Sequence, residues 1–114
     1  MRLNAQQMQV LEEHAREAAN RRVAAYVDAR FPQAFADRGD TQRCAVVERM
    51  RQAAAAFGIE RDDHLGSYIV LHVMYGPGFE TQDWAAPVLG SALLGPGEKI
   101  RTLERRVRAA GGQV

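Results

Sequence analysis

The sequence has one cysteine, no long apolar run and almost no net charge, and each shortage excludes a class of protein. A lone Cys44 excludes a disulfide scaffold, which needs paired cysteines. Fifteen Lys and Arg against 14 Asp and Glu leave a net charge of +1, too small for a chain kept disordered by its charge. The longest apolar run, 68–75, contains His72 and is less than half of the roughly 20 residues that a membrane-spanning helix needs. With 46% hydrophobic residues, the sequence predicts one soluble globular domain over 1–114.

Two further absences bear on location. Residues 1–4 lead into polar glutamines with no apolar segment, so the sequence predicts no secretory signal. Cys44 has no partner for an internal disulfide, which fits a reducing compartment. We therefore expect a cytoplasmic protein.

Apolar residues recur at spacings of three and four over most of the chain, which predicts an all-α fold. We expect a single compact bundle of four main helices, with one or two short helical turns before the last one. The first helix, of about 26 residues, begins after a capping box of Asn4 and Gln7 and ends near Arg30, ahead of Pro32. Because this helix is longer than the others can cover, a homodimer is an open alternative. Its apolar face contains Met8, Leu11, Ala15, Ala18, Ala19, Val23, Tyr26 and Val27.

Capping and turn residues mark the limits of two further helices. Asp40 or Thr41 is suited to cap the second helix, and Gly58 is suited to end it in a Schellman motif. Pro96 opens the last helix near its first position. The buried stripe of that helix is predicted to contain Ile100, Leu103, Val107 and Ala110.

The segment 65–75 is ambiguous. Its β-branched and aromatic residues favour a buried strand. No other segment of the chain reads as a strand, and a lone strand has no partner for its backbone hydrogen bonds. We therefore predict a central helix that is covered by the others and ends at Gly76.

The residues that most often carry chemistry form no catalytic or metal-binding motif. No two of His14, His64 and His72 have the i, i+4 spacing that places paired ligands on one helix face. Asp62 and Asp63 precede His64 directly, which is typical of a helix N-terminus stabilised by the helix dipole. His72 is predicted to be a hydrogen-bonded core residue. We therefore expect no catalytic residue, no metal and no cofactor.

Charge is unevenly distributed along the chain. Nine Arg face seven acids in 1–55, one Arg faces five acids in 56–97, and five bases face two acids in 98–114. The basic last segment invites a nucleic-acid hypothesis, because clustered Arg neutralises phosphates. However, Glu104 lies four residues before Arg108, a spacing typical of a solvated helix face, and no recognition-helix pattern precedes it. A protein is therefore the expected partner.

The acidic middle third contains the candidate binding surface. The stretch 76–84 combines a rigid Gly-Pro-Gly turn, two aromatic residues and carboxylates, a composition typical of a protein-binding surface with aromatic anchors. The alternative is that Phe79 and Trp84 plug the end of the bundle. The candidate partner-binding residues are Gly76, Pro77, Gly78, Phe79, Glu80, Asp83 and Trp84.

Several short segments carry a family resemblance. They are Ala54–Ile59, Met74–Phe79, Trp84, Leu89 and Gly97–Leu103. In this order the chain resembles small helical proteins encoded beside effector and chaperone genes in bacterial type VI secretion clusters. The resemblance implies a non-enzymatic adaptor or co-chaperone that contacts a secreted effector, its chaperone or a spike-tip protein. It carries over no catalytic residue.

Two alternative functions stay open at this stage. One is an immunity protein that occludes the active site of a toxin. The other is a small enzyme or ligand-binding bundle that uses His72, Cys44 or the 62–64 cluster.

Overall fold

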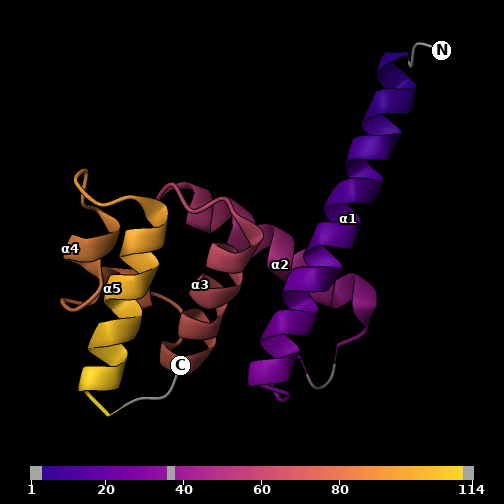
Figure 1. The fold of residues 1–114 in the computed structure, drawn as a ribbon. Helices are drawn as coiled ribbons and strands as arrows, with labels where there is room; N and C mark the ends of the chain where they lie inside the picture. Colours follow the sequence, from indigo (N-terminus) through magenta and orange to yellow (C-terminus); the bar gives the residue numbers. More distant parts are fainter. Residues whose placement is uncertain (1–3, 36–37, 112–114) are drawn as a thin grey trace.

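The computed structural model describes residues 4–35 and 38–111. In this part of the chain all regular structure is helical, which confirms the predicted all-α fold of four main helices with short additional turns. The elements in chain order (Figure 1) are α1 (Ala5–Arg30), α2 (Asp40–Ala55), α3 (Asp62–Tyr75), the 3-10 turn η1 (Phe79–Thr81), α4 (Ala86–Leu89) and α5 (Pro96–Ala109).

The ambiguous segment forms α3, which lies at the centre of the bundle as predicted. It packs against α1 and α2 on one side and against α5 on the other (Figure 1). Burial against several neighbours outweighs the strand propensity of its β-branched residues. The helix ends at Gly76, and its buried residues are Leu65, Gly66, Tyr68, Ile69, Val70 and Leu71.

The C-terminal end of α2 agrees with the prediction, but its N-terminal end does not. At its C-terminus Gly58 has a φ of +79°, and the two backbone hydrogen bonds of a Schellman motif are present at 3.0 and 3.1 Å. Ile59 is fully buried behind this turn. The predicted cap by Asp40 or Thr41 is wrong, because Gly39 occupies the N-cap without a side-chain hydrogen bond and Asp40 is already helical.

The buried stripe of α5 agrees in part with the stripe that the sequence predicts. Ile100, Leu103 and Val107 are buried as predicted, but Ala110 is exposed because the helix ends one residue before it. Lys99 is buried instead, and its Nζ donates a 3.0 Å hydrogen bond to the carbonyl of Phe57. This lysine therefore ties α5 to the C-terminal end of α2.

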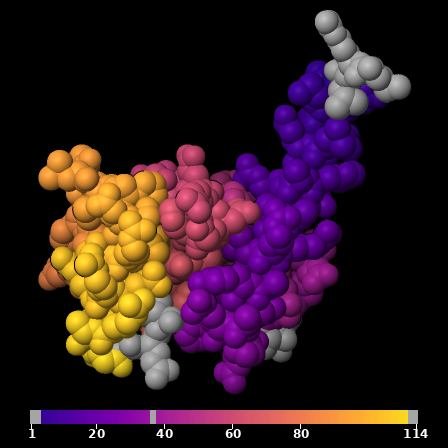
Figure 2. All heavy atoms as spheres, viewed as in Figure 1, coloured from indigo at the N-terminus to yellow at the C-terminus, as the bar shows by residue number. Residues whose placement is uncertain are grey.

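The C-terminal half of α1 packs against α2 and α3, which with α5 form the body of the molecule. The helix begins with the predicted capping box, in which Asn4 and Gln7 exchange hydrogen bonds of 3.0 and 2.8 Å. Residues 4–17 are exposed, and this half projects away from the other helices (Figures 1 and 2). The prediction that the apolar face of α1 packs against the core is therefore wrong for the first half of this helix. The buried residues of α1 are Asn20, Val23, Ala24 and Val27.

A polar network joins α1 to α2 and α3 where α1 leaves the body. The buried Asn20 accepts two hydrogen bonds from the Arg51 guanidinium, at 2.8 and 3.2 Å, and donates one to Glu48 at 3.3 Å. Arg51 also donates to Asp62 of α3 at 2.9 Å. Sequence reasoning missed this network, although an asparagine between apolar positions of a helix was a usable signal.

Gly66 allows α3 to approach α1 closely. A Cβ atom at this position would lie 2.6 Å from Cδ1 of the Tyr26 ring. We expect Gly66→Ala to lower the free energy of unfolding by about 1 kcal/mol, because overpacking costs about 1–3 kcal/mol and the helix propensity of alanine offsets about 1 kcal/mol. Urea unfolding followed by circular dichroism measures this change, with Ser67→Ala as the control. Equal or higher stability of Gly66→Ala would show that the ring moves aside without cost.

Candidate protein-binding surface

The turn after α3 has a backbone geometry that requires two glycines. Gly76 has a φ of +83° and Gly78 a φ of +86°, in the left-handed region that side-chain-bearing residues rarely adopt. Pro77 lies exposed between them, with its own φ restricted by the ring. The turn reverses the chain so that η1 packs against α3. The Gly-Pro-Gly segment therefore positions the residues that follow it.

Phe79 is a core residue. Its side chain is fully buried, with ring centroids 5.5 Å from Tyr68, 6.0 Å from Trp84 and 6.2 Å from His72. A side chain with no exposed surface cannot contact a partner. The prediction of Phe79 as a partner-binding residue is therefore wrong, and the plug interpretation is right for this residue.

Trp84 lies at the surface side of the same aromatic cluster. Its ring is partly exposed and lies 4.9 Å from Tyr75, a residue that sequence reasoning did not select. The indole Nε1 donates to Gln82 at 2.7 Å, and the Trp84 carbonyl accepts a 2.7 Å hydrogen bond from Arg106 of α5. The tryptophan is thus held from two sides while part of its ring faces solvent.

We call the accessible part of this region the aromatic end surface. Tyr75 is 36% exposed, and Pro77 and Asp83, which lie between Tyr75 and Trp84 in the sequence, are exposed as well. The surface is defined by Tyr75, Pro77, Asp83 and Trp84. The Trp84 ring packs on the buried Phe79 ring and the Tyr75 ring packs on Trp84, so both rings are held in place before any partner binds.

Glu80 has a structural role within this end of the bundle. Its carboxylate accepts a 2.7 Å hydrogen bond from the buried hydroxyl of Tyr68. Burial, followed by this hydrogen bond to the carboxylate, raises the pKa of Tyr68 above its ordinary value, so the phenol stays a proton donor. Glu80 thereby anchors η1 to α3 and leaves little of its carboxylate for a partner.

His72 differs from its prediction as a hydrogen-bonded core residue. Its side chain is 27% exposed, and its Nδ1 lies 3.8 Å from Glu80 with no hydrogen-bond partner in the described part of the chain. The ring lines a groove of about 360 Å³ between α2 and α3, together with Arg38 and Arg49. The groove has an apolar floor and contains neither Cys44 nor a carboxylate among its described lining residues.

The other candidate chemical groups are not brought together. Asp62 and Asp63 each bind an arginine, at 2.9 and 3.0 Å, in the first turn of α3. Cys44 lines a pocket of about 160 Å³ on α2 whose described lining contains no histidine. Across residues 4–35 and 38–111, no three acidic, histidine or cysteine side chains are grouped as a metal site would require.

Comparison with known proteins does not extend these observations. The chain has no significant match among protein-family models, curated proteins or solved structures. None of the helices in the described ranges combines the length and the apolar composition needed to cross a membrane.

Proposed function

We propose that this chain is a non-enzymatic, cytoplasmic adaptor or co-chaperone that binds a type VI secretion effector, the chaperone of that effector or a spike-tip protein. The type VI context is the one that the family resemblance implies. The contact is made by the aromatic end surface. The observation that carries the proposal is the partly exposed Tyr75–Trp84 pair, with ring centroids 4.9 Å apart.

This pair suits protein recognition for two physical reasons. Tyrosine and tryptophan bury a large area while losing few rotatable bonds, and they are enriched among the residues that dominate binding energy. The pair is also held in place, by the packing of Trp84 on the buried Phe79 ring and by the hydrogen bond from Arg106 to the Trp84 carbonyl. A partner that covers the exposed parts of these rings with an apolar side chain gains contact area without ordering a loop.

Trp84→Ala tests the proposal in the presence of the partner. Co-expression with the products of neighbouring genes should yield a complex, and Trp84→Ala should weaken that complex about tenfold or more. We expect the far-ultraviolet circular dichroism of the variant to be unchanged, because the ring is partly exposed and the core beneath it is filled by Phe79. Titration calorimetry on the purified complex measures the effect.

Gln42→Ala, on the exposed surface of α2, is the matched control and should leave binding unchanged. A chain that stays uncomplexed with every neighbouring gene product would refute the proposal. Loss of helical structure in Trp84→Ala would assign Trp84 to the core instead. Rescue of cells from a neighbouring toxin by co-expression would identify an immunity protein.

A further inference from the structure

The N-terminal half of α1 has little contact with the other described elements: residues 4–17 are exposed, although Arg16 reaches Glu48 of α2 at 3.2 Å. Its large apolar side chains are half exposed: Met8 49%, Val10 49% and Leu11 53%. Figure 2 shows this half standing clear of the remaining helices. A single helix of this length is marginally stable in water. Burying its exposed apolar side chains against another surface is favourable, because it removes them from water.

Two of these side chains belong to a stripe that is separate from the packed face of α1. We define the α1 stripe as Met8, Leu11, Ala15 and Ala18, which follow each other at spacings of three, four and three. This is the a/d pattern of a coiled coil. The next position at the same spacing is Arg22, which is exposed. The buried residues of α1, which begin at Asn20, occupy a different face of the helix. Met8, Leu11 and Ala15 are exposed and Ala18 is partly exposed, so the stripe lies outside the buried face of α1.

The stripe is complementary to itself. Its large residues, Met8 and Leu11, lie toward the tip of α1, and its small residues, Ala15 and Ala18, lie toward the body. In an antiparallel coiled coil, a positions of one helix face d positions of the other. An antiparallel pair of α1 helices thus places Met8 against Ala18 of the second copy and Leu11 against Ala15 of the second copy. Every layer then contains one large and one small side chain.

We propose that two copies of this chain associate through the α1 stripe as an antiparallel, two-fold symmetric pair. A two-fold interface uses the same surface on both copies, which the alternation of large and small residues satisfies. A parallel pair would stack alanine on alanine and leave gaps there. The antiparallel arrangement also places the two bodies at opposite ends of the paired helices, so the projection of α1 provides the room that the second copy needs (Figure 1).

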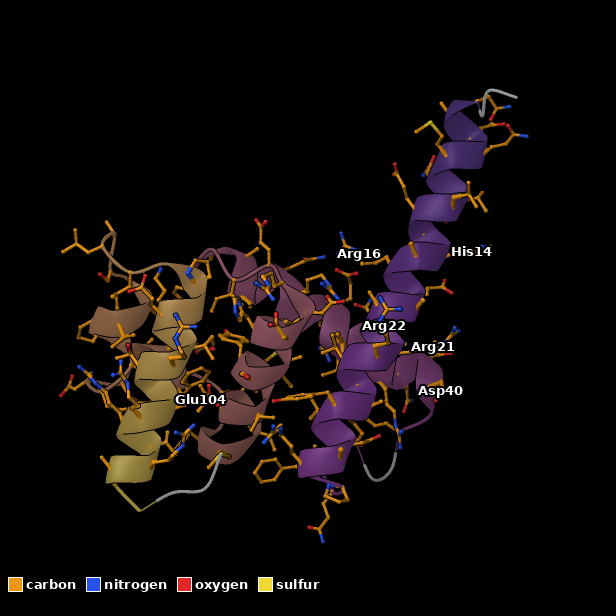
Figure 3. All side chains as sticks on the ribbon, viewed as in Figure 1. His14, Arg16, Arg21, Arg22, Asp40 and Glu104 are labelled. Carbon is orange, nitrogen blue, oxygen red and sulfur yellow. The ribbon has the colours of Figure 1, made fainter. Side chains whose placement is uncertain are left out.

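Residues that flank the stripe identify the register. Antiparallel pairing brings Glu12 beside Glu12 of the second copy, because e positions face e positions, and places Gln7 near Arg21 of the second copy. Figure 3 shows that His14 and Arg16 lie on opposite sides of α1, so polar side chains are present on both sides of the helix. The two glutamates repel each other, which weakens the dimer. In a parallel pair Glu12 would face Gln7 instead.

Sedimentation equilibrium on the full chain tests the proposal. We expect the average mass to rise from one chain toward two with concentration. Leu11→Glu should raise the dissociation constant about tenfold or more, because it places a charge in an apolar layer. Glu12→Gln should lower the dissociation constant about twofold by removing the like-charge pair.

Val10→Glu is the matched control, because Val10 is as exposed as Met8 but lies off the stripe. It should leave the dissociation constant unchanged. Ala15→Glu, at the position that faces Leu11 of the second copy, is a second disrupting variant. Circular dichroism checks that all four variants keep their helices. A monomer at every concentration, equal effects of Val10→Glu and Leu11→Glu, or weaker association of Glu12→Gln would each overturn the proposal.

Discussion

Phe79→Ala is expected to lower the free energy of unfolding by about 3–5 kcal/mol, the range for removing a fully buried phenylalanine side chain. The ring fills the space between Tyr68 of α3 and Trp84, with centroids 5.5 and 6.0 Å away. Its removal leaves a cavity among the aromatic rings that surround it at the end of the bundle. Urea unfolding followed by circular dichroism measures the loss.

Trp84→Ala is the comparison for this experiment. Because the indole is only partly buried, the same measurement should show a smaller loss than for Phe79→Ala. The two variants therefore separate the residue that stabilises the fold from the residue that is available to a partner. A loss of less than about 1 kcal/mol for Phe79→Ala would contradict its role as a plug.

Asn20→Ala is expected to lower the free energy of unfolding by about 2 kcal/mol. The substitution removes one buried amide that accepts from the Arg51 guanidinium and donates to the Glu48 carboxylate, and leaving a buried polar group without its hydrogen-bond partner costs about 1–3 kcal/mol. The higher helix propensity of alanine offsets part of this loss. Arg51 keeps its 2.9 Å contact with Asp62, so one part of the network survives. Thermal and urea unfolding measure the change.

Arg16→Ala provides a matched control within the same network. Arg16 pairs with Glu48 at 3.2 Å, but its side chain is 53% exposed, and exposed ion pairs contribute about 0–1 kcal/mol. The variant should therefore lose much less stability than Asn20→Ala. Equal losses would show that the network acts through its exposed charges rather than through the buried amide.

The helices were predictable because their signals are local. The capping box at Asn4, the Schellman ending at Gly58 and the stop at Gly76 each depend on backbone groups within a few residues, and all three are present. The identity of α3 was a harder case. The strand propensity of its residues was outweighed by a property of the whole sequence, in which no other segment has the pattern of a strand that could pair with it.

The candidate site was predictable in its location but not in its composition. The Gly-Pro-Gly turn and Trp84 lie where the sequence pattern placed them, but Phe79 turned inward and Tyr75 joined the surface. Residue type alone does not distinguish an aromatic plug from an aromatic anchor, because both are large and apolar. The difference depends on which rings η1 meets when it folds back onto α3.

The sequence determined the helices, their ends and the spacing of apolar residues, because these follow from 3.6-residue periodicity and from local capping chemistry. The tertiary structure decided which faces are covered. It left residues 4–17 of α1 exposed, buried the amide of Asn20 between the charged side chains of Glu48 and Arg51 on α2, and buried Lys99 at the end of α2. The periodicity of apolar residues predicts which face of a helix is apolar, but the number and position of neighbouring helices decide how much of that face is buried.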